Sequence, residues 1–189
     1  MNRRSSTGER IGTLTIGPVR LELDSDDPFL REVVERRYGA FLGDDIGDPC
    51  LELRPLLPGP ETGSPYENDV RLEDGRLTIA SPVLAASIDL AAGRGTISVS
   101  CDPLACEYYL ENALRQTMQV LAIERGGLLL HAAGVIPPAG HGLVFTGRSG
   151  AGKSTISGIL RRAGGLVLSD DLVLIDASGE RPQLRSTPF

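Results

Sequence analysis

Residues 147–155 constrain the fold more than any other part of the chain, because they match the phosphate-loop pattern of Gly, four residues, then Gly-Lys-Ser. The apolar residues 142–146 before this loop predict a short buried strand, and residues 154–162 after it predict a helix. A strand, a glycine-rich loop and a helix in this order are typical of a nucleotide-binding site. The candidate binding residues are Gly147, Arg148, Ser149, Gly150, Ala151, Gly152, Lys153, Ser154 and Thr155.

The residue types in this loop suit phosphate binding. Glycines allow successive backbone N–H groups to converge on phosphate oxygens at the positive end of the following helix. Lys153 is then positioned to reach the β- and γ-phosphates, and the Ser154 hydroxyl to bind Mg²⁺. Lys153 is also the sole lysine of the chain, since every other basic residue is arginine. The sequence therefore predicts that ATP and Mg²⁺ bind here.

Two acids and a histidine are the candidate catalytic partners of the loop. Asp170 and Asp171 end an apolar segment, residues 166–168, that predicts the strand beside the loop. At a carboxyl strand end, one carboxylate can hold Mg²⁺ and the other can accept a proton from an attacking hydroxyl. His131 interrupts the apolar run 128–136, which predicts a strand buried on both faces next to the phosphate-loop strand. An imidazole there could contact the γ-phosphate or orient a carboxylate.

Composition argues against several other classes of function. The net charge is −6 and the isoelectric point is about 5.0, which disfavours a nucleic-acid partner. No signal peptide and no membrane-spanning apolar stretch is visible, so we expect a cytoplasmic protein without a membrane partner. The three cysteines lack the spacing of a zinc site and are interpreted as reduced thiols.

The rest of the chain predicts an α/β fold in three parts. Residues 1–10 are polar and are expected to form a disordered tail. Residues 11–101 predict an N-terminal α+β accessory region, with a helix after residue 28 and antiparallel hairpins, one of them around residues 73–75. A turn-rich connector spans residues 55–65. Residues 102–189 contain a long helix to about residue 124 and the phosphate-loop core with its flanking helices.

The histidine strand, the loop and the early Asp-Asp pair together resemble the HPr kinase/phosphorylase-like proteins, across about residues 104–189. The resemblance implies a phosphoenolpyruvate-carboxykinase-like phosphate-loop core and an ATP- and Mg²⁺-dependent serine kinase acting on a protein or peptide. It implies that Lys153 and Ser154 bind nucleotide phosphates and Mg²⁺. It also implies that Asp170 deprotonates the serine hydroxyl, that Asp171 assists the metal, and that His131 is the family's active-site histidine.

A further expectation concerns how the chain departs from that family. Related chains continue past the position of Phe189 with more strands, so we expect a homo-oligomer or a partner that completes the sheet. Two other functions stay open. One is a non-catalytic nucleotide-binding or regulatory module, which is a truncated kinase. The other is a small-molecule kinase of the adenylyl-sulfate type, although such kinases place an arginine after the acidic strand end where this chain has Leu172 and Val173.

Overall fold

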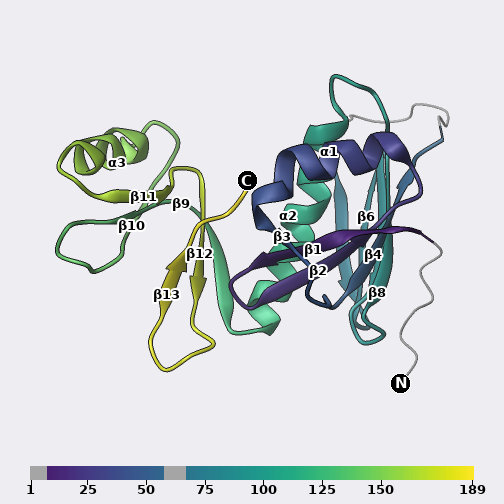
Figure 1. Ribbon diagram of the computed structural model, residues 1–189, viewed down its shortest axis with the longest axis horizontal. Coiled ribbons are helices and arrows are strands. Elements are labelled where there is room, and N and C mark those ends of the chain that lie inside the picture. The colour runs from purple at the N-terminus through teal and green to yellow at the C-terminus, as the bar shows by residue number, and fades with distance from the viewer. Residues whose placement is uncertain (1–7, 58–66) are drawn as a thin grey trace. The chain divides into compact units, whose positions relative to one another are not determined.

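The computed structural model describes residues 8–57 and 67–189, which form two compact units (Figure 1). Unit 1 contains Arg20–Thr117 and the described residues that precede Ile16. Unit 2 contains Ile16–Val19 and Met118–Phe189. Both units combine helices with mostly antiparallel sheets, which confirms the mixed α/β class expected from the sequence.

Unit 1 is built on an eight-stranded sheet with the order β3-β1-β2-β4-β8-β7-β6-β5. Strands β2, β4 and β8 run parallel to one another, whereas β5 to β8 form antiparallel hairpins. The bounds are β1 Arg10–Ile16, β2 Val19–Asp24, β3 Leu42–Gly43, β4 Cys50–Pro55, β5 Asp69–Glu73, β6 Arg76–Ser81, β7 Leu84–Asp89 and β8 Arg94–Val99.

Two helices cover the apolar face of this sheet. Helix α1, Pro28–Tyr38, begins where the Asp27 side chain accepts a hydrogen bond from the Leu30 N–H, and Pro28 occupies its first turn. It continues as the short 3₁₀ helix η1, Gly39–Phe41. Helix α2, Cys106–Glu124, is the longest helix of the described residues; its residues up to Thr117 belong to unit 1 and the rest to unit 2. Apolar residues at alternate positions of the strands pack against apolar residues of the helices and form a core. The fully buried residues of this core include Leu23, Leu30, Val34, Leu51, Leu53 and Ile97.

Unit 2 is organised around one strand, β9, Gly127–Ile136. Its N-terminal half pairs with β12, and its C-terminal half lies between β10 and β11, all antiparallel. A last strand, β13, pairs with β12. The bounds are β10 Leu143–Thr146, β11 Leu166–Ser169, β12 Leu172–Asp176 and β13 Gln183–Arg185. Helix α3, Lys153–Arg162, packs against β9 and β11.

Several local predictions can be compared with these elements. The expected hairpin at Glu73-Asp74-Gly75 is confirmed, with φ values of 50° and 73° at its last two residues. β1 begins at Arg10, the last residue of the expected tail, whereas residues 1–7 lie outside the described residues. Most of the predicted connector, residues 58–65, also lies outside them.

Among residues 8–57 and 67–189, no helix combines the length and the apolar character needed to cross a membrane.

A buried carboxylate closes the β12–β13 hairpin of unit 2. Asp176 accepts hydrogen bonds from the Ser178 hydroxyl at 2.6 Å and from the Ser178 N–H at 3.1 Å. The Arg185 guanidinium donates to it at 3.4 Å. Hydrogen bonding from the Ser178 side chain is the largest of the effects that hold the pKa of Asp176 below its usual value, and burial opposes them. The folded state therefore favours the charged form of this carboxyl.

We expect Asp176→Ala to lower the free energy of unfolding by about 2 kcal/mol at neutral pH, because hydrogen bonds to a buried charge are lost. Since the folded pKa is lowered, this stabilisation is complete above the unfolded pKa of about 4. It is lost as the pH falls through the folded pKa. Urea unfolding of wild type and variant across this range tests the prediction, with Ser178→Ala as a partial loss. A stability difference that stays constant on acidification would contradict it.

Candidate phosphate-binding site

The loop between β10 and α3 has the backbone that its glycines make possible. Gly150 and Gly152 have φ values of 77° and 89°, in the left-handed region that L side chains rarely adopt. Gly152 is the residue that immediately precedes α3, and its carbonyl accepts the N–H of Ile156 at 3.0 Å. A further bond from the Ala151 N–H to the Arg148 carbonyl, at 3.1 Å, tightens the loop. The first residues of α3 therefore leave their N–H groups directed to the exposed loop.

The Lys153 side chain folds back over this loop. Its ammonium donates to the Gly147 carbonyl at 3.1 Å, across six residues of the chain. The side chain is half-buried, whereas Ser149, Gly150 and Ser154 are exposed. Within the described residues the ammonium has no carboxylate within ion-pair distance. Its charge is therefore available to an anion that enters the loop.

The strand that carries the acids is not the neighbour of the phosphate-loop strand, which corrects the sequence prediction. β9 lies between β10 and β11, because it pairs with β10 on one side and with β11 on the other. β10 and β11 therefore run parallel to each other, one strand apart. Two strand spacings separate the end of β10 from the acids, which is about 10 Å. The expectation that the histidine strand lies beside the phosphate-loop strand is confirmed.

His131 and Asp171 form a close pair on the surface of unit 2. The His131 Nδ1 lies 2.8 Å from the Asp171 Oδ1, with the two side chains 60% and 58% exposed. The backbone supports this geometry, because the Ala132 N–H donates to the Asp171 carbonyl at 2.9 Å. The apolar pattern predicted a strand buried on both faces, and this prediction is wrong at His131, which is exposed. This exposure allows His131 to act in a surface site.

Ser169 shapes the acidic turn, and the sequence reasoning missed it. Its hydroxyl accepts the N–H groups of Asp171 at 3.2 Å and Leu172 at 3.1 Å. A bulge between Val167 and Ser169 shifts the register against β9 at the same point. The sequence did contain a signal, because a serine at the start of a turn often accepts the backbone N–H groups two and three residues later.

Asp170 lies at the tip of this turn and is exposed. Across residues 8–57 and 67–189, no hydrogen bond or ion pair engages its carboxylate. The structure thus brings His131 and Asp171 together and brings Lys153 against its own loop. It gives no direct contact between Lys153 and either aspartate. A ligand that contacts both the loop and the acids must span the width of β9.

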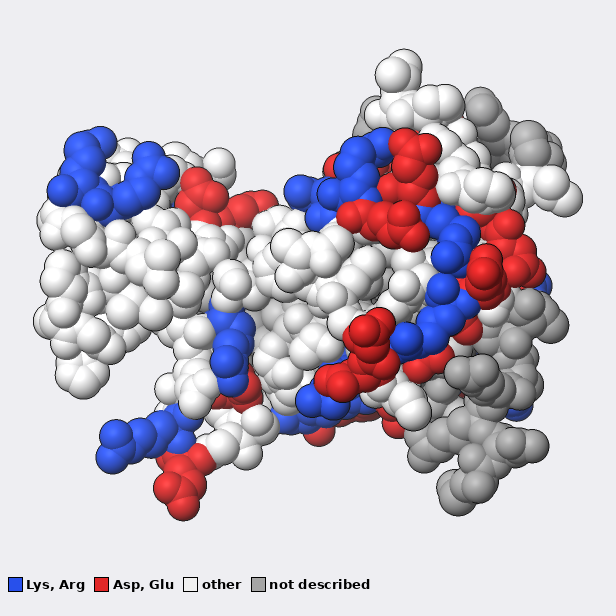
Figure 2. All heavy atoms as spheres, viewed as in Figure 1, with Lys and Arg blue, Asp and Glu red and all other residues white. Residues whose placement is uncertain are grey.

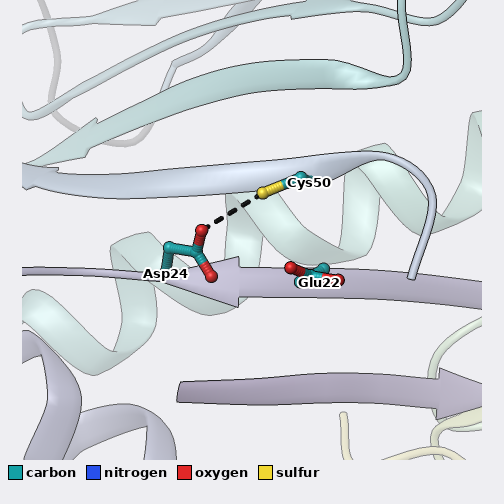
Figure 3. Close-up of side chains that lie close together, drawn as sticks. All are labelled: Glu22, Asp24 and Cys50. Carbon is teal, nitrogen blue, oxygen red and sulfur yellow. Dashed lines mark hydrogen bonds between the residues drawn. The ribbon is translucent and has the colours of Figure 1, made fainter. Parts of the chain in front are cut away.

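A second group of potential ligands lies in unit 1. Glu22 and Asp24 on β2 and Cys50 on β4 each place one ligand atom within 4.8 Å of the others. The Cys50 thiol donates to the Asp24 Oδ2 at 3.3 Å (Figure 3). Glu22 accepts the Gly47 N–H at 3.2 Å and faces the Arg10 guanidinium at 3.9 Å. A sulfur ligand does not suit Mg²⁺, so this group is unrelated to the predicted Mg²⁺ site.

The parallel pairing of β2 with β4 creates this group, which the sequence reasoning did not find. Glu22 lies opposite Cys50 in the register, although 28 residues separate them in the chain. The spacing of cysteines along the sequence carries no trace of such an arrangement. The signal that existed was the alternation of Arg20, Glu22 and Asp24 with the apolar residues of the same strand.

No protein-family model matches the chain, and the curated proteins contain no significant match to it. The residues of the loop and of the acidic turn, with their geometry, are therefore the basis for a function.

Two glycines of the same segment provide a matched test of the loop conformation. Gly152→Ala is expected to cost roughly 1–2 kcal/mol of stability, because alanine is strained at a φ of 89°. Gly158→Ala, inside α3, would place a Cβ in ordinary contact with the Arg162 guanidinium at 4.0 Å and is expected to stabilise by roughly 0.5–1 kcal/mol. Chemical unfolding of both variants measures the difference. Equal effects at the two positions would show that the loop does not hold Gly152 in this conformation.

Proposed function

We propose that unit 2 binds ATP with Mg²⁺ and transfers the γ-phosphoryl group to a serine hydroxyl of a protein or peptide. The observation that carries this proposal is the loop of residues 147–152, whose left-handed glycines place exposed backbone N–H groups at the start of α3. The finer fold expected from the sequence, a phosphoenolpyruvate-carboxykinase-like phosphate-loop core, is part of the same proposal.

Positive charge at this end of unit 2 supports the binding of a triphosphate. Lys153 contributes an ammonium beside the loop amides, and Arg148 adds an exposed guanidinium. Figure 2 displays basic side chains over α3 with acidic side chains close by. This local charge contrasts with the net charge of −6 of the whole chain and favours an anionic ligand.

The residues expected to hold Mg²⁺ fit its preference for oxygen ligands. Ser154 offers a hydroxyl in the first turn of α3, and Asp171 offers a carboxylate. A carboxylate has two oxygens, so Asp171 can hold His131 with Oδ1 and leave Oδ2 for the metal. When bound, Mg²⁺ would neutralise charge on the phosphate oxygens. His131 would fix the orientation of Asp171 with or without the metal.

Asp170 is the carboxylate that we assign to proton transfer. Its side chain is exposed and unengaged among the described residues, so a substrate hydroxyl can approach it from solvent. In the proposed step, the serine oxygen loses its proton to Asp170 and forms a bond to the γ-phosphorus, while the bond from that phosphorus to the leaving oxygen of ADP breaks. Lys153 and the loop amides would stabilise the charge that develops on the phosphate oxygens.

Nucleotide binding can be tested apart from phosphoryl transfer. Lys153→Ala is expected to weaken ATP binding at least tenfold, because the one lysine of the chain is removed from the loop. Calorimetric titration with ATP and Mg²⁺ measures the affinity. Arg162→Ala, at the opposite end of α3, is the matched control and should bind ATP nearly as wild type does. If the two variants bind equally well, the loop is not the phosphate site.

Variants of the two aspartates distinguish a kinase from a non-catalytic module. Asp170→Asn is expected to lower γ-phosphoryl transfer to serine-containing peptides at least a hundredfold while ATP still binds. Asp171→Asn should also lower transfer and should weaken the dependence on Mg²⁺. Glu180→Gln, an exposed acid of the β12–β13 turn, is the control. Wild-type transfer by both aspartate variants would refute the catalytic roles, and ATP binding without any transfer by wild type would identify a regulatory module.

A further inference from the structure

The strand β5 forms the open edge of the eight-stranded sheet in unit 1. It pairs with β6 on one side, and no strand of the described residues pairs with its other side. All five of its residues are exposed. The opposite edge of the sheet is β3, which has two residues only. A short edge strand resists pairing, whereas a five-residue strand offers a row of backbone donors and acceptors.

The two faces of β5 differ in character. Val70 and Leu72 lie on one face, 44% and 52% exposed, beside the buried Ile79 and Leu77 of β6. They continue the apolar face of the sheet to its edge. Asp69, Arg71 and Glu73 alternate with them on the other face, and Arg71 donates to Asp69 at 2.6 Å. The edge therefore carries an apolar row and a row of charges with the order negative, positive, negative.

We propose that β5 pairs antiparallel with β5 of a second copy of this chain, with Val70 opposite Val70 of that copy. A two-fold axis perpendicular to the sheet produces this pairing and keeps both apolar rows on the same face. In this register, Arg71 lies opposite Asp69 of the second copy, twice around the axis. Opposite charges on directly facing strand positions stabilise antiparallel pairs, so the charge pattern selects this arrangement.

The neighbouring registers are less favourable. A pairing centred on Arg71 sets Arg71 against Arg71 of the second copy and Asp69 against Glu73, which places like charges together. A pairing centred on Leu72 stops after three residues, because the turn residues Asp74 and Gly75 have φ values of 50° and 73°. Residues 67–68 precede β5 without a turn, so the register centred on Val70 can extend.

This association is expected to be reversible. A strand pair of this length buries little surface compared with a permanent dimer. Glu67 and Glu73 meet at both ends of the register, where water and salt screen their repulsion only in part. Sedimentation equilibrium of wild type should therefore give a mass that rises with concentration from 20.1 kDa toward twice that value.

A charge swap tests the proposed register. Arg71→Asp sets two acids against each other and Asp69→Arg sets two guanidiniums against each other, so each variant should weaken dimerisation at least tenfold. The double variant Asp69→Arg with Arg71→Asp restores opposite charges and should recover affinity to within about threefold of wild type. Circular dichroism confirms that the variants fold. A double variant as weak as the singles would overturn the proposal.

Cross-linking provides an independent measurement. Under oxidised glutathione, which is reduced as two thiols join, Val70→Cys should form a covalent dimer because the two residues face each other. Leu72→Cys should not, because it faces Asn68 of the second copy. Wild type, with Cys50, Cys101 and Cys106, is the control. A chain that stays monomeric at every concentration overturns the proposal and leaves the edge to a different strand or to solvent. Dimers cross-linked at residue 72 and not at residue 70 overturn the register.

Discussion

The backbone pairing of β9 is the interaction on which unit 2 depends. This one strand forms backbone hydrogen bonds with β10, β11 and β12, and these three strands do not pair with one another. β12 also pairs with β13. Ala132, Ala133 and Val135 are fully buried at its centre. Because β10 delivers the glycine loop and β11 delivers the acids, β9 determines how far apart these two groups lie.

The local elements around the loop could be predicted from the sequence because their signals are local. Glycines at residues 150 and 152 indicated the loop, the apolar run 128–136 indicated β9, and the turn residues 73–75 indicated the hairpin of β5 and β6. What the sequence placed wrongly was the strand order, since residues 166–168 were expected beside the phosphate-loop strand. Strand order depends on long-range pairing, which a local pattern does not record.

Side chains that meet across strands were harder to predict for the same reason. Glu22, Asp24 and Cys50 are brought together by a parallel pairing, and no periodicity distinguishes a parallel from an antiparallel neighbour here. The pairing of His131 with Asp171 was one of two options left open, and the register of β9 with β12 favours it by setting His131 opposite Leu172. The chemistry that follows from these residues stays a prediction.

The turn that carries the two acids has both of its flanks attached to the same strand. β11 pairs with β9 before the turn and β12 pairs with β9 after it, so Asp170 and Asp171 form a short link between two strands that share one partner. A segment anchored at both ends in this way cannot swing as a lid, because any large displacement would break ladder hydrogen bonds. The backbone that carries the two acids is therefore held in position before a ligand arrives. The Asp171 carboxylate is also held, by its pair with His131, whereas the exposed Asp170 side chain can turn toward a substrate.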